Sequence, residues 1–184
     1  MILFVNACVR GDSRTKRIAD YLLSLLNEEV FELRLSDIEY PVADEDFLVK
    51  RDRLILEGDF DNPMFSLAAR FSKADKIVIA APYWDLSFPA VLKQYFEQIN
   101  VVGITFKYSD DGVPIGLCNA SKLYYVTTAG GNFTPVEYGY GYVKALANGF
   151  YGISDVELIK ADGLDIVGAD EAKIIQECME KIKL

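Results

Sequence analysis

The amino-acid sequence predicts an α/β fold, a three-layer sandwich in which a five-stranded parallel sheet of order 2-1-3-4-5 carries helices on both faces. Five apolar segments of strand length alternate with amphipathic segments of helix length along the 184 residues. Residues 76–81 are apolar without alternation, as in a central strand buried on both faces. The chain length fits a single domain over residues 1–184 and is short for a six-stranded dinucleotide fold.

Hydrophobic periodicity and capping residues define the elements of the first half. Ile18, Leu22 and Leu25 recur on one face of the first predicted helix. Asn62 and Pro63 supply an N-cap side chain and a first-turn proline for a third helix. The predicted elements are a buried strand at 2–7, a helix at 13–27, a half-exposed strand at 30–35, a helix at 47–57 inside the acidic segment 36–62, and a helix from 63 to about 72.

The second half continues the alternation and adds one hairpin. Asp110, Asp111 and Gly112 form the turn signal between two short strand patterns, which predicts a small antiparallel insertion. The predicted elements are the central strand at 76–81, a helix at 87–99, hairpin strands at 103–108 and 113–117, a strand at 123–128, a helix near 135–150, a strand at 157–161 and a helix at 169–183.

Composition excludes several classes of function. A net charge of −9 argues against nucleic-acid binding, which needs a basic face. The complete lack of histidine removes Ser-His and Cys-His nucleophiles and most transition-metal sites, so we expect no metal centre. Three widely separated cysteines favour a reducing compartment over a disulfide framework. With no apolar run of membrane-spanning length, we expect a cytoplasmic protein with no membrane partner.

Ligands of such sheets bind beyond the carboxyl ends of the strands, where the strand order reverses between strands 1 and 3. That rule selects three loops, at residues 8–15, 82–87 and 128–133. The first combines Arg10, Gly11, Ser13 and Thr15 at a predicted helix start, where free backbone N–H groups and the helix dipole favour an anion. Two simpler interpretations stay open: Ser13 only caps the helix, and the basic cluster of residues 10–17 is a solvated charged surface.

The other two loops suit a flat aromatic ligand. Tyr83 and Trp84 follow the central strand directly, at the rim where such a ligand would lie. Gly130 and Gly131 would let the backbone approach a planar ring closely. The alternatives are ordinary core or interface aromatics and a tight turn. Together the loops predict a phosphate at one end and a ring system at the other, as in flavin mononucleotide (FMN).

Three sequence blocks carry a resemblance to a known family. They are VIAAPYWDLSFPAVLKQYF at 78–96, GITFKY at 103–108 and YVTTAGG at 125–131. In order and spacing they resemble the flavodoxin-fold, FMN-dependent NAD(P)H oxidoreductases of the azoreductase and quinone oxidoreductase group. The resemblance implies that Ser13 and Thr15 bind the flavin phosphate. It also implies that the flavin ring is held by Pro82, Tyr83, Trp84, Asp85 and Leu86 of the second loop and by Thr128, Ala129, Gly130 and Gly131 of the third.

Two positions depart from the family pattern. Asp85 stands where asparagine is common and offers no amide donor, and its carboxylate would oppose negative charge on a reduced flavin. Ala129 replaces an arginine, which changes the expected substrate preference. We keep both residues among the predicted cofactor contacts.

The resemblance implies a ping-pong reaction in which NAD(P)H reduces the flavin and leaves before a quinone, azo compound or nitroaromatic binds. The cofactor carries this chemistry, so we predict no catalytic side chain. FMN is favoured over FAD because no adenosine-binding extension is evident. A homodimer is implied, with residues 104–108 and 133–142 at the boundary. The alternative is a flavodoxin-like electron carrier or redox-sensing module without turnover; a hydrolase finds no support in the sequence.

Overall fold

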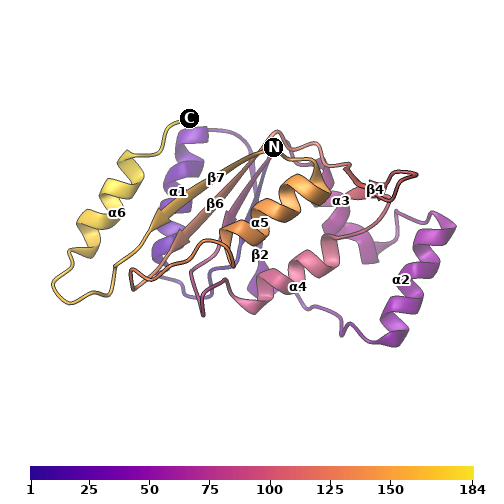
Figure 1. Cartoon of the computed structure of the whole chain (residues 1–184), viewed down its shortest axis with the longest axis horizontal. Coiled ribbons are helices and arrows are strands. Elements are labelled where there is room, and N and C mark those ends of the chain that lie inside the picture. Colours follow the sequence, from indigo (N-terminus) through magenta and orange to yellow (C-terminus); the bar gives the residue numbers. More distant parts are fainter.

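The computed structural model describes all of residues 1–184 and has one parallel sheet at its centre (Figure 1). Its strands lie in the order β2-β1-β3-β6-β7, which is the predicted order 2-1-3-4-5 once the two short hairpin strands are left out of the count. All four pairings are parallel. The strands are β1 (Ile2–Asn6), β2 (Val30–Arg34), β3 (Lys76–Ala80), β6 (Lys122–Thr128) and β7 (Asp155–Ala161). The predicted fold class is confirmed.

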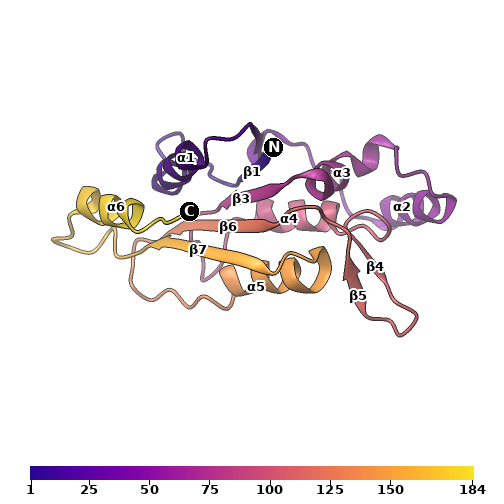
Figure 2. The same ribbon diagram turned by 90° about the horizontal axis from the view of Figure 1, so that it is seen from above.

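Helices cover both faces of the sheet, as the sequence predicts (Figure 2). On one face, α1 (Arg14–Leu26) and α6 (Glu171–Glu180) pack over a buried cluster that includes Phe4 and Val78. On the other, α3 (Ser66–Lys73), α4 (Ala90–Ile99) and α5 (Tyr140–Leu146) enclose the larger core. Burial of these apolar stripes is the main force that holds the helices against the sheet.

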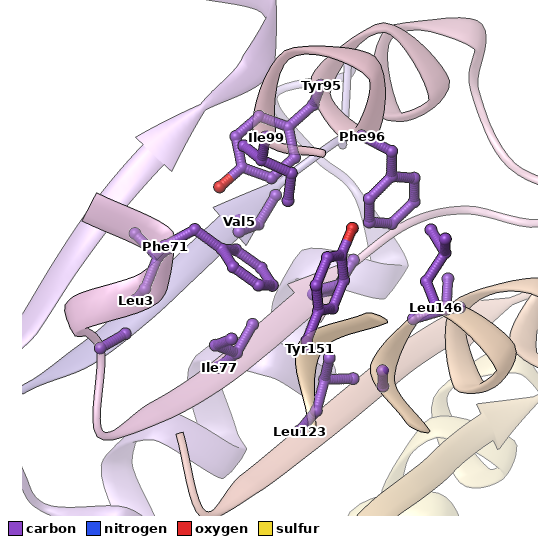
Figure 3. Close-up of a cluster of buried hydrophobic side chains, with 14 of the residues drawn as sticks. Leu3, Val5, Phe71, Ile77, Tyr95, Phe96, Ile99, Leu123, Leu146 and Tyr151 are labelled. Carbon is purple, nitrogen blue, oxygen red and sulfur yellow. The ribbon is translucent and has the colours of Figure 1, made fainter. Parts of the chain in front are cut away.

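Aromatic side chains fill the larger core (Figure 3). The rings of Phe71 and Tyr151 meet edge to face with centroids 4.7 Å apart, and Tyr95 lies against Phe71 at 6.3 Å. The buried Tyr151 hydroxyl donates a hydrogen bond of 2.7 Å to Oδ1 of Asn100, so this polar group is satisfied. The buried hydroxyl of Tyr95 in the same cluster has no hydrogen-bond partner in the protein.

Several boundaries differ from the sequence-based prediction. Helix α4 begins at Ala90 and not at residue 87, because residues 84–87 form a turn and Pro89 takes the N-cap position. Helix α5 begins at Tyr140, since residues 131–139 are loop, and it continues as a π-helical turn over Ala147–Tyr151 that the sequence did not predict. Helix α2 (Glu45–Glu57) begins earlier than predicted because Asp44 accepts a hydrogen bond from the backbone of Phe47.

Two elements lie away from the sheet. The hairpin of β4 (Phe106–Tyr108) and β5 (Pro114–Gly116) confirms the predicted antiparallel insertion. Helix α2 stands at the far end of the molecule in both ribbon views, and only its Leu54 is buried (Figures 1 and 2). None of the helices has the length and apolar character that crossing a bilayer requires.

Candidate functional site

An open crevice of about 610 Å³ lies beyond the carboxyl ends of β1, β3 and β6. Its volume falls within the range of about 300–1,000 Å³ that small-molecule sites occupy. The lining residues come from the loops after β1, β3, β6 and β7, and from the first turns of α1 and α6. They are Val9, Arg10, Asp12, Ser13, Arg14, Thr15, Arg17, Pro82, Tyr83, Trp84, Thr128, Gly130, Asp165 and Glu171. The structure therefore brings together members of all three loops that the sequence selects.

The loop after β1 presents a run of unpaired backbone donors. Ser13 caps α1 by accepting a bond of 3.3 Å from the N–H of Lys16. From Val9 to Thr15, however, no backbone N–H has an acceptor within the protein. These donors surround the positive end of the α1 dipole, the arrangement that binds phosphate in many proteins. Capping and anion binding are therefore compatible here, because they use different donors.

Thr15 and Thr128 connect the first loop to the third. Their hydroxyl oxygens lie 2.7 Å apart, and both residues are buried. Neither hydroxyl has another partner in the protein. This single bond fixes the first turn of α1 against the end of β6, at the floor of the crevice.

The basic cluster of the first loop is largely ion-paired. Nη1 of Arg14 lies 2.6 Å from Oδ1 of Asp165 and 3.3 Å from Oε2 of Glu171, and Arg17 lies 3.5 Å from Glu171. The hydrogen bond from Arg14 lowers the pKa of Asp165, while Asp165 raises the pKa of Arg14. Arg10 forms no ion pair and is exposed at the crevice. Of the cations that line the crevice, Arg10 is therefore the one that is not already committed to a carboxylate.

The second loop forms a wall and a strained turn. Pro82, Tyr83 and Trp84 line the crevice, and Trp84 is 42% exposed. Asp85 and Leu86 do not line it; they are the central residues of a two-residue turn closed by reciprocal hydrogen bonds between Trp84 and Ser87. Their φ angles of 50° and 69° are left-handed, the conformation of a type I′ turn, which normally prefers Asn-Gly. The N–H groups of Asp85 and Leu86 have no acceptor in the protein.

The third loop contributes less side-chain surface than the sequence predicts. Thr128 and Gly130 line the crevice, whereas Ala129 and Gly131 do not. The Ala129 side chain is buried, and its N–H donates to the carbonyl of Ala161 in the sheet. The N–H groups of Gly130 and Gly131 are unpaired. The contribution of this loop is thus mainly backbone.

Loops two and three are bonded to each other. The N–H of Tyr83 donates to the carbonyl of Thr128 at 2.9 Å, and its hydroxyl donates to the carbonyl of Pro135 at 3.3 Å. Ser87 donates through its hydroxyl to the carbonyl of Tyr138 at 2.7 Å. Burial raises the pKa of Tyr83, so its phenol stays protonated at neutral pH and remains a donor.

The aromatic side chains of residues 133–142 differ in their exposure to solvent. Phe133 and Tyr138 are 79% and 61% exposed. Tyr140 instead donates its hydroxyl to the carbonyl of Val156, and Tyr142 packs against the core. Within residues 133–142, only the part from Phe133 to Tyr138 therefore offers exposed aromatic surface of the kind expected at a subunit boundary.

Sequence reasoning missed six lining residues, Val9, Asp12, Arg14, Arg17, Asp165 and Glu171. Arg14 and Arg17 belong to the basic cluster and could have been named from it. Asp165 and Glu171 follow β7, and the rule that ligands lie beyond strand ends applies equally to that fifth strand. Extending the rule by one strand would have found them.

Comparisons with known proteins give one consistent result. A family model described as having the flavodoxin-like fold matches residues 1–184. A Clostridium perfringens protein named FMN-dependent NADH:quinone oxidoreductase is 35% identical over 189 residues, covering 98% of this chain and 94% of the relative. A Clostridium acetobutylicum protein, FMN-dependent NADH:quinone oxidoreductase 2, is 37% identical and covers 97% and 92%. The crystal structure of an azoreductase from Bacillus anthracis superposes with a TM-score of 0.81 at 26% identity, covering 98% of this chain and 95% of that one.

Proposed function

The chain belongs to the flavodoxin-like family that its full length matches, and from that premise we infer that it is an FMN-dependent oxidoreductase that reduces quinones or azo compounds with NADH. The relatives named for this activity align over nearly the whole chain, which supports the reaction class. The observation that carries the assignment is the convergence of three loops, rich in unpaired backbone donors, on one crevice at the sheet reversal.

The phosphate of FMN fits the first loop. The unpaired N–H groups between Val9 and Thr15 supply donors, and Arg10 supplies a cation that is not bound to a carboxylate. Ser13 and Thr15 line this region and carry hydroxyls, and that of Thr15 is bonded to the Thr128 hydroxyl at the floor. These groups would hold a phosphate through backbone amides more than through side-chain charge.

The ring of FMN fits the second and third loops. Tyr83 and Trp84 supply apolar and aromatic surface, and the unpaired N–H of Gly130 supplies a donor inside the crevice. The N–H groups of Asp85 and Leu86 are also unpaired, and they lie in the turn directly after the lining residue Trp84, where they would meet polar atoms at the edge of the ring. We therefore propose that Asp85 and Leu86 contribute through their backbone and not through their side chains. The Asp85 carboxylate does not line the crevice, which reduces the conflict with negative charge on the ring.

Bound FMN supplies the hydride transfer that no side chain of this chain can perform. The protein's part is to position the ring, leave one face open and keep donors in place. Tyr83 is fixed for this task by its two hydrogen bonds to the third loop and the segment that follows it. No histidine is needed, because none of these tasks requires a strong base at neutral pH.

We also propose a homodimer in which exposed aromatic surface is covered. Phe133, Tyr138 and Tyr108 are all more than half exposed, and they belong to the two segments that the sequence selects. Light scattering on the purified protein should give twice the mass of one chain, and a monomer mass would remove this part of the proposal. The three free cysteines support a reducing compartment, and we propose the cytoplasm.

The test is spectroscopic and kinetic. The purified protein should be yellow, release FMN identified by mass, and oxidise NADH with a soluble quinone at a steady rate. Comparing NADH with NADPH in the same assay identifies the donor. A protein that binds FMN but does not turn over NADH would instead be an electron carrier or redox-sensing module. A colourless protein that fails to take up added FMN would contradict the proposal altogether.

A further inference from the structure

Asp165 lines the crevice from the loop after β7, and its carboxylate contacts two other parts of the lining, the Arg14 guanidinium and the backbone at Gly130. One carboxylate oxygen lies 2.6 Å from Nη1 of Arg14, and the other lies 3.3 Å from Nη2, which makes a forked ion pair. The second oxygen also lies over Gly130: a Cβ built on that glycine would be 2.1 Å away. The carboxylate therefore covers both a guanidinium of the first loop and the open backbone of the third.

The backbone of Asp165 is fixed in this place. Its N–H donates to the carbonyl of Gly130 at 2.9 Å, and the N–H groups of Gly163 and Leu164 donate to Gly131 and Ala129 at 3.0 and 3.2 Å. Three successive N–H groups of this loop therefore donate to three carbonyls of the third loop. Any release of the carboxylate from the crevice has to come from rotation of the side chain, because these bonds hold the main chain.

The charges that line the crevice are balanced. Three guanidinium groups, those of Arg10, Arg14 and Arg17, face three carboxylates, those of Asp12, Asp165 and Glu171. A phosphate monoester carries between one and two negative charges near neutral pH. Such a group would be attracted to Arg14 and repelled by the Asp165 carboxylate that already holds it.

The ion pair can be broken at low cost. The Asp165 side chain is 64% exposed and that of Arg14 is 27% exposed, so water screens the pair and solvates the carboxylate after it leaves. Glu171 remains within 3.3 Å of Arg14 and keeps its guanidinium directed toward the crevice. A phosphate can therefore replace Asp165 at Arg14 without rearrangement of the fold.

We propose that Asp165 competes with the cofactor phosphate for Arg14, so that this one carboxylate sets how tightly the protein holds FMN. In the free protein it occupies Arg14 and covers Gly130, and on FMN binding its side chain turns outward. The cofactor is consequently held more weakly than its amide and arginine contacts alone would allow, and it exchanges with free FMN. This inference rests on the proposed FMN site and adds the residue that limits its affinity.

The experiment compares D165N with wild type, using D20N as a matched control. Asp20 is also an exposed carboxylate paired with a cation of the same segment, at 2.7 Å from Lys16, but it does not line the crevice. Both variants remove one negative charge without a change of size. Dissociation constants for FMN and for riboflavin, which lacks the phosphate, are measured on the apoprotein by quenching of flavin fluorescence.

We expect D165N to bind FMN about fivefold to tenfold more tightly than wild type, with riboflavin and both D20N constants changed less than about twofold. Unchanged FMN affinity in D165N would overturn the inference. So would equal weakening of FMN and riboflavin, which would mean that Asp165 accepts hydrogen bonds from the bound flavin. An equal gain in D20N would also overturn it, because net charge alone would then explain the effect. A wild-type protein that binds neither flavin would instead refute the proposed function, so the two failures are distinguishable.

Discussion

The Thr15–Thr128 hydroxyl pair allows a quantitative test of how the first and third loops are joined. We predict that T15V and T128V each destabilise the apoprotein, whereas the double variant is less destabilised than the sum of the two. The physical reason is that each hydroxyl is buried and has the other as its one partner in the protein. Either single change leaves a buried hydroxyl without a hydrogen bond, and the double change removes both.

The burial of the two hydroxyls sets the expected loss in the free energy of unfolding. Thr15 is 1% exposed and Thr128 is 6% exposed, so each orphaned hydroxyl is largely cut off from bulk water. An unsatisfied buried polar group costs about 1–3 kcal/mol, and the nearby crevice places these sites at the lower part of that range. We expect about 1–2 kcal/mol for each single variant and a coupling free energy of about 1–2 kcal/mol in the cycle. Valine matches threonine in shape and branching, so packing changes little.

Urea denaturation of the four apoproteins, followed by far-ultraviolet circular dichroism, supplies the free energies of unfolding. Equal slopes against urea would show that the variants unfold as the wild type does. Additive effects, with a coupling of less than about 0.5 kcal/mol, would refute the reasoning, because the hydroxyls would then not depend on each other.

Three further predictions concern the second loop and the thiols. Replacing Asp85 and Leu86 by Asn-Gly, the preferred type I′ pair, should stabilise the apoprotein by about 1 kcal/mol in thermal unfolding, and an unchanged midpoint would show that the turn is not strained. Y83F removes the donor to the carbonyl of Pro135, so amide exchange measured by mass spectrometry should become faster at Gly141, whose N–H donates at 2.7 Å to the carbonyl of Val136, the residue after Pro135; unchanged protection would exclude a role for this bond. Burial raises the pKa of Cys118 from 9.0 to about 12, so iodoacetamide at pH 8 should label it about a thousandfold more slowly in the folded than in the unfolded chain. Keeping this thiol protonated contributes stability that is fully present below pH 9 and is lost as the pH rises toward 12. Between pH 9 and 12 the denaturation midpoint of the wild type should therefore fall further than that of C118A, and equal falls in the two proteins would contradict the prediction.

The fold was predictable because its determinants are local and repeated. The apolar run of residues 77–81 predicts a strand buried on both faces, and Ile18 and Leu22 at helical spacing predict a helix on one of them. The right-handed crossover rule then leaves few sheet orders to consider. The errors lie at element boundaries, which contacts outside the local pattern determine. Helix α4 starts later than predicted because residues 84–87 form a turn bridged between Trp84 and Ser87, and the π-helical turn before Gly152 places Tyr151 in the core.

The candidate site was predictable in its location and less so in its chemistry. Strand-end geometry selected the rim at which the structure has its crevice. It does not determine which side chains line that crevice, because this depends on the backbone conformation of each loop. Asp85, Leu86 and Ala129 lie in the selected loops yet do not line the crevice. The ion pair of Arg14 with Asp165 joins residues 151 positions apart, and no local pattern in the sequence pairs them.

The hydrogen bonds that join the second and third loops also determine the path by which a ligand can arrive. Because Tyr83 and Ser87 are bonded to residues of the opposite segment, neither of those two walls can swing aside without breaking bonds to the other. The stretch from Val9 to Asp12, which lines another side of the crevice, has no such ties through its backbone donors. We therefore expect the association rate of a flavin to follow the motion of this short stretch, with the walls acting as a fixed frame.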